Sequence, residues 1–546
     1  MLDLLLFPAM VGAIVLPGFF VFRWLELLER ITLGAALGVI LLGGLAFLRF
    51  LVILPGSAAR TLGLVVLLSC VAGALVAGAI CRAKRQPAEG NRQAQRIPRA
   101  LLASLVGAAL LGLGVEATLP HYDLAARYYD WFVHFDLARI YEHGSGLDTR
   151  WGDAGVTTRT PLYNLLGAGA MLLFGDRFQV FQVLTAAVAW LWLLPTALIA
   201  RRLLRDRWLT PVALLGLSPL LLQTTTYAWS KGLVAFFALL ALDRCLALRE
   251  ASHESMPSTA IQLGVVSAAT VMTHPGFVGL PLALFGLLLY DAVRRRAGWL
   301  RVGLTSAGGL LVALPWYVWA IAQYGLSHTL FGYPLAQYPS VFRWAFDRLL
   351  IVVTSLLPIT LPLDHFLTNP LTTVFLLYVG TATGLLGLGF LLRSLAQNLK
   401  PARRWGRSNA ERTALIFAGV GFLVADLLHE GVVSNDGATF GIPTFVVLAL
   451  LMIKANPLTR TTMALAVTEC LLINTAIVAW VLSPAAQSLP NAAAAALNHI
   501  RFLGQDLWPV GLVIALAGCV ASLIGLRLAL KQETGESLRL DSRRAA

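Results

Sequence analysis

The sequence predicts an all-α polytopic membrane protein, a bundle of about 13–16 transmembrane helices. Three observations predict this class. Of the 546 residues, 58% are hydrophobic and only 13% are charged, and the mean hydropathy is +0.75, whereas about a quarter of an average soluble chain is charged. Apolar runs of roughly 20 residues, long enough to cross a hydrocarbon core, recur along the sequence. These runs are continuous, which excludes the short alternating segments of a membrane barrel.

The elements follow from the apolar runs. The expected spans are 3–24, 30–54, 61–82, 100–119, 178–200, 209–226, 228–249, 260–274, 276–293, 301–321, 371–393, 413–429, 439–454, 459–483 and 506–530. The first run is too long and too uniformly apolar for a cleavable signal peptide and lacks a basic start, so it counts as a span. The run from Pro161 to Gly175 breaks the alternation of sides, and we expect a short re-entrant or interfacial helix there, buried against protein.

The distribution of basic residues predicts how the chain is oriented in the membrane. The formal net charge is +14, and the basic residues cluster in short loops, which is the positive-inside pattern and not a sign of nucleic-acid binding. The cytoplasmic markers are Arg82 to Arg99, Arg201 to Arg207, Arg294 to Arg296, Lys400 to Arg407 and the basic C-terminal tail. This orientation places the segments 120–159, 322–370, 430–438 and 484–505 on the non-cytoplasmic side.

Four segments summarise the expected organisation. Residues 1–119 form N-terminal transmembrane helices, and 120–176 form an outer loop with the interfacial helix. Residues 177–393 form a central bundle that includes the outer loop 322–370, and 394–546 hold the C-terminal helices and tail. The five cysteines lie in or beside apolar runs without close spacing, so neither a disulfide framework nor a metal site is expected.

The outer loop carries a dense polar constellation. Between Pro120 and Asp136 the chain holds three carboxylates, two histidines and a row of aromatic residues. If this stretch is helical, Asp123, Arg127, Asp130 and His134 share one face. An amphipathic helix lying on the membrane, with its aromatic rings at headgroup level, is an equal alternative.

Other ionisable residues fall on the same predicted side. These are Glu116 at the end of a span, Arg159 before the re-entry, Lys231 at the start of a span, His274 in a tight turn, and Asp426, His429, Glu430 and Asp436 at a later outer end. Ionisable groups at membrane depth pair, line a cavity or perform chemistry. A carboxylate can serve as a general base toward an acceptor hydroxyl, and cations can neutralise a phosphate leaving group. Acid hydrolysis and proton-coupled transport use similar residues.

At this point the sequence resembles the GT-C superfamily of multispanning glycosyltransferases, which use polyprenyl-phosphate-linked sugars. The resembling motifs span roughly residues 120–325. They are Tyr129-Asp130-Trp-Phe-Val-His134, Thr158-Arg159-Thr160-Pro161-Leu-Tyr163-Asn164, Phe174-Gly175, Ala200-Arg201-Arg202-Leu203, Trp229-Ser230-Lys231-Gly232, Thr273-His274-Pro275 and Pro315-Trp316-Tyr317-Val-Trp319. The resemblance implies a catalytic outer loop of the GT-C kind on the helical bundle.

The resemblance also implies roles for single residues. Asp130 matches the base that deprotonates the acceptor, with Asp123 as its rival, and His134 and Asp136 line the same loop. Three further residues meet the donor phosphate: Arg159, Lys231 and His274.

The sequence departs from the family pattern in three places. Thr439 to Pro443 lacks the cation and the tyrosine of a late family motif. Three spans precede the catalytic-type loop, where the family usually has one. No Asp-x-Asp pair stands in the first outer loop, so no cofactor is expected, although a divalent metal stays open.

These observations favour an inverting glycosyltransferase of the bacterial inner membrane with its active site outside, acting in the cell envelope. Its partners would be a polyprenyl-phosphate sugar donor, a lipid or glycan acceptor and membrane lipids, with no nucleic acid. The alternative is a transporter or flippase for a lipid-linked or amphipathic substrate, which predicts ionisable groups deep in the spans, such as Glu469. A third interpretation is a non-catalytic assembly partner in envelope synthesis. The sequence names neither sugar nor acceptor.

Overall fold

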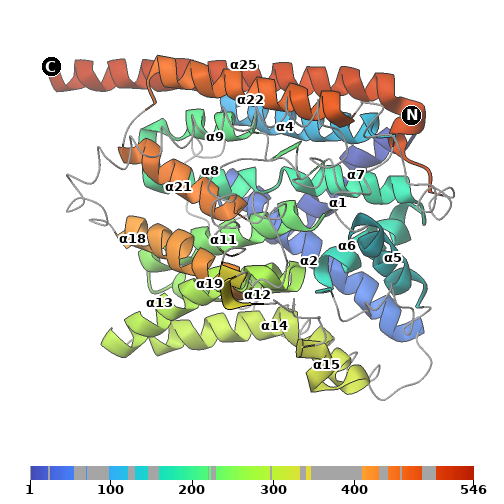
Figure 1. Ribbon diagram of the computed structural model, residues 1–546. Helices are drawn as coiled ribbons and strands as arrows, with labels where there is room; N and C mark the ends of the chain where they lie inside the picture. The colour runs from blue at the N-terminus through green and yellow to red at the C-terminus, as the bar shows by residue number, and fades with distance from the viewer. Residues whose placement is uncertain are drawn as a thin grey trace.

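Helices are the only regular secondary structure in the described part of the protein, as the sequence predicts (Figure 1). The computed structural model describes residues 2–22, 25–53, 97–120, 130–144, 159–218, 229–295, 298–331, 409–428, 441–455, 458–481, 500–545 and a few isolated positions between them. The helices are α1 (Leu2–Val21), α2 (Leu27–Ile53), α4 (Arg99–Thr118), α5 (Asp130–His143), α6 (Leu162–Phe174), α7 (Phe178–Ala189), α8 (Leu193–Leu204), η3 (Arg205–Arg207), α9 (Leu209–Leu215), α11 (Lys231–Glu250), α12 (Met256–Thr273), η4 (Pro275–Phe277), α13 (Gly279–Arg295), α14 (Trp299–Tyr324), α15 (Leu326–Phe331), α18 (Asn409–Ile416), η6 (Phe417–Gly421), α19 (Phe422–Leu428), α21 (Ile442–Ala455), α22 (Arg460–Val481) and α25 (Leu503–Ala545).

Six helical segments among the described residues are long and apolar enough to cross a membrane. They are Leu27–Val52, Arg99–Thr118, Phe178–Arg207, Pro275–Arg294, Trp299–Tyr324 and Leu503–Thr534. The chain is therefore an all-helical membrane protein. The expected spans 61–82 and 371–393 lie outside the described residues, apart from isolated helical positions in the first, so the total of 13–16 helices stays a prediction.

Small residues bring α4 and α25 into close antiparallel contact. Glycines recur every seventh residue on α25, at Gly504, Gly511, Gly518 and Gly525. The first faces the backbone of Leu119, directly after α4, and the other three face α4 itself. A Cβ atom added at Gly518 would lie 2.3 Å from the backbone nitrogen of Leu111. Side chains at these positions would force the backbones apart, so the glycine repeat fixes how closely the two helices pack.

The predicted short helix is α6. It has 13 residues, and ten of them, Leu162 to Met171, are buried. It packs against α2 and α5, and a Cβ at Gly169 would lie 2.8 Å from the Leu42 carbonyl oxygen of α2. The sequence-based expectation of a short helix buried against protein is confirmed, while its position relative to the membrane surface stays a prediction.

The expected span 178–200 is divided into α7 and α8. Pro195 lies in the first turn of α8, where its missing N–H costs nothing, but its ring prevents α7 from continuing through this point. Between the helices, Leu191 N donates to Val188 O and Leu193 N to Trp190 O, so i→i+3 bonds carry the chain through the break. The apolar segment remains continuous from Phe178 to Arg207.

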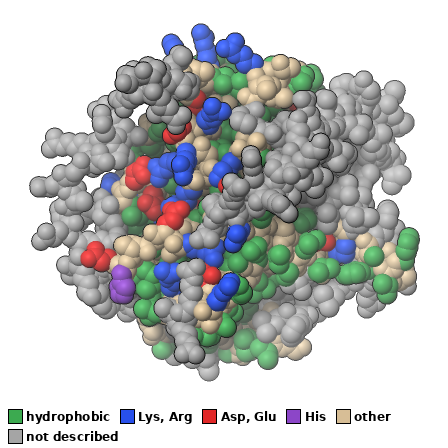
Figure 2. Space-filling view, turned by 90° about the vertical axis from the view of Figure 1, so that its left-hand side faces the viewer, with side chains coloured by type: hydrophobic (Ala, Val, Ile, Leu, Met, Phe, Trp, Pro, Cys, Tyr) green, Lys and Arg blue, Asp and Glu red, His purple; other side chains and the backbone are tan. Residues whose placement is uncertain are grey.

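Charged side chains gather at one end of the bundle, the face shown in Figure 2. We call it the arginine end and define it by Arg201, Arg202 and Arg244. There Arg202 and Arg244 both bind Asp243, while Arg244 Nη1 lies 2.5 Å from Glu29 and Arg201 Nη1 lies 2.5 Å from Glu26. These pairs tie together α8, α11 and α2. The helices α5 and α6 lie at the opposite end (Figure 1).

Candidate active site

His134 and Asn164 form a buried polar pair between α5 and α6. His134 Nδ1 lies 2.7 Å from the side-chain oxygen of Asn164, and both residues are buried. An amide oxygen can only accept, so Nδ1 donates, and a neutral imidazole then offers Nε2 as an acceptor. The ring also meets Tyr163 edge-on, with 5.1 Å between ring centroids. These contacts hold the imidazole in one orientation.

Helix α7 carries the polar groups that support this pair. Thr185 Oγ1 donates to the Phe181 carbonyl oxygen, so the Tyr163 hydroxyl, 3.0 Å away, donates to Thr185. One turn earlier, Gln182 Nε2 donates to the fully buried Glu116 carboxylate at 3.3 Å. The Gln182 side-chain oxygen accepts from Leu503 N at 2.9 Å. The helix thus connects the α5–α6 pair to the ends of α4 and α25.

Lys231 and His274 form a second pair at the first residue of α11. Lys231 Nζ lies 2.8 Å from His274 Nε2, and Lys231 is 2% exposed. The ammonium lies over the rings of Trp229 and Phe277, at 5.1 and 5.8 Å from their centroids. Gly276 N donates to His274 Nδ1 at 3.2 Å, and this bond orients the ring so that Nε2 faces Lys231.

The two pairs are built around the same helix. A Cβ atom at Gly232 would lie 3.0 Å from Ala189 Cα, so the start of α11 packs directly on the last turn of α7. Thr185, one turn earlier on α7, supports Tyr163 and through it the His134 ring. Tyr163 and Gly232, which belong to motifs separated in the sequence, therefore both contact α7.

The other predicted site residues are distributed as follows. Asp130 is the first residue of α5, but its side chain and the whole of Asp123 lie outside the described residues. Asp136 is partly buried on α5, and burial raises the pKa of its carboxyl above the ordinary range, while the Arg139 guanidinium opposes that rise. Arg159 is partly buried just before α6. The roles of all seven residues stay predictions.

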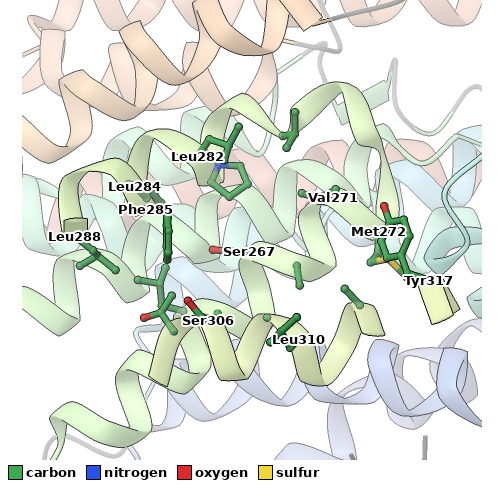
Figure 3. Close-up of a pocket in the computed structure, with 18 residues that line it drawn as sticks. Ser267, Val271, Met272, Leu282, Leu284, Phe285, Leu288, Ser306, Leu310 and Tyr317 are labelled. Atoms are coloured by element: carbon green, nitrogen blue, oxygen red, sulfur yellow. The ribbon is translucent and has the colours of Figure 1, made fainter. Parts of the chain in front are cut away.

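An apolar cavity of about 420 Å³ lies between α12, α13 and α14 (Figure 3). Its walls are mostly Leu, Val, Phe and Ala side chains, with Ser267 and Ser306 as minor polar contributions. Met272 and Tyr317 lie together at one end of the cavity, and Leu288 lies at the other. Met272 and Val278, which line the cavity, flank the His274 turn in the chain.

Together these features can accept an amphipathic anion. A buried ammonium at a helix N-terminus attracts negative charge, since the first backbone N–H groups of a helix lack intrahelical partners. The adjoining cavity offers apolar surface of the kind that a hydrocarbon chain buries.

Sequence reasoning missed several of these supporting groups. Gln182, Thr185 and the pairing of Asn164 with His134 carry no signal of their own, because single polar residues on apolar helices are common. The arginine end was detectable: Asp243 and Arg244 interrupt an expected span, and charges inside spans are costly unless paired. The seventh-residue glycine repeat of α25 was also readable from the sequence.

Comparison with known proteins gives a limited likeness. No family model matches the chain, and no curated protein matches it. Its structure is similar to the crystal structure of ArnT from Cupriavidus metallidurans bound to undecaprenyl phosphate, with 17% identity, 80% of this chain and 77% of that chain covered, and a TM-score of 0.47. The apo structure of the same protein gives 16% identity with the same coverage and TM-score. At this identity and TM-score the likeness carries no argument about this chain, and we draw function from its own residues.

Proposed function

We propose that the protein is a glycosyltransferase that moves a sugar from a polyprenyl-phosphate donor to a hydroxyl of a lipid or glycan acceptor. The observation that carries the proposal is the buried Lys231–His274 pair, in a turn whose neighbours in the chain, Met272 and Val278, line the apolar cavity. A polyprenyl phosphate has two matching parts, an anionic head and a long apolar tail. The head would meet Lys231 while part of the tail lies against Met272 and Tyr317.

The proposed phosphate site stabilises the leaving group. Negative charge grows on the phosphate oxygens as the bond from the sugar breaks, and cations already in place stabilise that charge without reorganising. Lys231 is held over Trp229 and Phe277 in a buried environment, where its interaction with an anion is weakly screened by water. His274 and Arg159 supply further donors. Neutralisation of a single phosphate by these groups needs no metal in the reaction itself.

The proposed base is a carboxylate of the loop that leads into α5, either Asp130 or Asp123. The acceptor hydroxyl transfers its proton to that carboxylate while its oxygen forms the new bond to the sugar anomeric carbon. The bond from this carbon to the phosphate oxygen breaks on the opposite side, which inverts the configuration. His134 and Asp136 on α5 would contact the sugar or the acceptor.

We place this chemistry on the non-cytoplasmic face of a bacterial inner membrane, in envelope synthesis. The support is the distribution of charge: the predicted cytoplasmic markers Arg201 and Arg202 lie at the arginine end, while α5 and α6 lie at the opposite end. Lipid-linked donors and membrane lipids reach such a site from within the bilayer.

The test is transfer of radiolabelled sugar by purified protein in lipid, from a panel of polyprenyl-phosphate donors. The variants are Asp130→Asn and Asp123→Asn, with Asp506→Asn as the control, since Asp506 is an exposed carboxylate on α25. Loss of transfer in one variant of the loop, with the control active and all proteins folded, would support the proposal and identify the base. Donor binding without consumption by the wild-type protein would contradict it and favour the flippase, to be followed in proteoliposomes.

A further inference from the structure

A second polar cluster lies where the end of α5 meets the turn between α6 and α7. It consists of Glu142 and His143, the last two residues of α5, and Asp176. His143 Nε2 lies 2.8 Å from Asp176 Oδ2 and 3.8 Å from Glu142 Oε2. One ligand atom from each of the three residues falls within 4.8 Å of the others. None of the three is among the residues assigned above to catalysis.

Backbone geometry brings these side chains together. Gly175 follows α6 with a φ of +103°, a conformation that a residue with a Cβ rarely adopts. This turn reverses the chain so that Asp176 faces the end of α5. Gly144, with a φ of +66°, ends α5 directly after His143. The cluster therefore joins two chain reversals.

Glu142 is the unusual member. Its side chain is 9% exposed, yet its Oε2 accepts no hydrogen bond among the described residues. A buried carboxylate oxygen without a donor is costly, and such atoms in folded proteins call for an explanation. Oε2 is directed toward His143 and Asp176, so the missing partner belongs between these three residues.

We infer that Glu142, His143 and Asp176 bind a divalent transition-metal ion such as Zn²⁺. Bonds of about 2.0–2.2 Å in a tetrahedral site put ligand atoms roughly 3.3–3.6 Å apart. The present separations of 2.8 and 3.8 Å therefore need shifts of about half an ångström, and the two carboxylates, whose ligand atoms lie within 4.8 Å of each other, must close to the same distance. One imidazole and two carboxylates suit zinc or a similar ion better than Mg²⁺ or Ca²⁺, which prefer all-oxygen sites. Water would complete the coordination, because His143 is 46% exposed.

Two cations already lie near the cluster. Arg139 Nε donates to Asp176 Oδ2 at 3.3 Å, and Arg49 of α2 is the other positive group near Glu142. Arg139 is 42% exposed and can turn toward solvent. A metal ion would therefore compete with Arg139 for Asp176, and removing the guanidinium should strengthen metal binding.

The ion would fasten the last turn of α5 to the α6–α7 turn. Since α5 also carries His134 and begins at Asp130, the site would set the position of the proposed catalytic helix from its far end. The ion would be structural and would touch none of the reacting atoms.

The experiment is calorimetric titration of chelator-stripped, full-length protein with Zn²⁺, with Mg²⁺ as a comparison ion. We expect one Zn²⁺ per chain in the wild type, at least about 10-fold weaker binding in His143→Ala and Glu142→Gln, and tighter binding in Arg139→Gln. His253→Ala, which removes an exposed histidine between α11 and α12, is the matched control and should bind as the wild type does.

Zn²⁺ should also raise the Tm of the wild type and not that of Glu142→Gln. If His143→Ala does not fold, the Zn²⁺ affinities of Glu142→Gln and Arg139→Gln still test the inference. Wild-type protein that takes up no Zn²⁺ at about 100 µM overturns the inference, and so does equal affinity in the wild type and Glu142→Gln. Neither result bears on the proposed glycosyl transfer, which does not pass through this site.

Discussion

Lys231 illustrates how a charge is maintained inside an apolar bundle. Its ammonium group lies over two aromatic rings, each of which interacts favourably with a cation. A position at the first residue of α11 adds unpaired backbone N–H groups nearby. The same features that stabilise the cation make the site attractive to an anion.

Replacing Lys231 should therefore act on the transition state. We expect Lys231→Ala to lower kcat/KM for sugar transfer by about 10²–10³-fold, the range for removing one preorganised charge from such a site. Lys231→Arg should retain part of the activity, because the charge persists with different geometry. Lys454→Ala, which removes a lysine on α21 that pairs with Glu411 of α18, is the control. Unchanged kcat/KM in Lys231→Ala would rule out a role for Lys231 in transfer.

Asp136 gives a prediction about pH. Burial raises the pKa of its carboxyl, so the folded protein holds this proton to a higher pH than the unfolded chain does. The associated stability is present below the unfolded pKa, near 4, and is lost as the pH rises through the folded pKa. We expect Asp136→Asn to raise the Tm at pH 7, with the difference from wild type shrinking toward pH 4. A higher Tm that is independent of pH would contradict this explanation.

At the residue scale, sequence reasoning located candidates but not their partners. Motif order placed Lys231 and His274 in one predicted site, and the structure brings their side chains within 2.8 Å. Spacing along a helix could not pair His134 with Asn164, since these residues belong to different helices whose contact depends on tertiary packing. Sequence reasoning also could not decide whether Asp130 or Asp123 is the base.

Among the elements, α4 and α25 depend most directly on residue size. Gly518→Ala should lower the free energy of unfolding by about 1–3 kcal/mol, because the added methyl group overlaps the Leu111 backbone. Gly303→Ala on α14, where an added Cβ meets no atom within 4 Å, is the matched control and should be neutral or stabilising by about 0.5–1 kcal/mol. Unfolding in mixed SDS micelles measures both. Equal changes in the free energy of unfolding for the two variants would show that the close approach of α4 and α25 does not restrict side-chain size at Gly518.

The ion pairs of the arginine end should matter more than exposed ones. Asp243 is fully buried and binds both Arg202 and Arg244. Asp243→Asn leaves buried positive charge without its main partner, which costs about 3–5 kcal/mol in comparable sites. Asp506→Asn breaks the exposed pair with Arg501 and should leave stability unchanged. SDS-induced unfolding of the two variants separates these cases, and a stability loss of similar size in both would contradict the prediction.

Helices could be predicted from the sequence where the length and hydropathy of an apolar run determine their bounds. The short α6 and the long α14 follow the sequence closely. The break between α7 and α8 was missed because Pro195 stands in a continuous apolar run, and hydropathy does not register a missing N–H. The span expected at 209–226 is represented by α9, which ends at Leu215 before Gly216. At the start of α9, Glu533 of α25 accepts hydrogen bonds from the backbone nitrogens of Leu209 and Thr210. This cap comes from a distant part of the chain, so the local sequence could not predict it.

For the whole molecule, orientation is the quantity to measure. Single cysteines at Arg501 and Arg207, in a background without the native cysteines, report on the two ends of the bundle. Both positions are exposed. A membrane-impermeant maleimide should label Arg501→Cys in intact spheroplasts and Arg207→Cys only after permeabilisation. The reverse pattern would place the proposed active site on the cytoplasmic side and exclude the orientation derived from the positive-inside rule.

The contact between α4 and α25 also has a consequence for synthesis. α25 begins nearly 400 residues after α4 ends, which at about 5–20 residues per second corresponds to ~20–80 s of translation. Throughout that interval the α4 face containing Gly107 and Gly114 has no native partner and must be shielded by lipid, by the insertion machinery or by an earlier helix. Nascent chains stalled before residue 503 should therefore be open to quality-control proteases along α4, and completion of α25 would end that exposure.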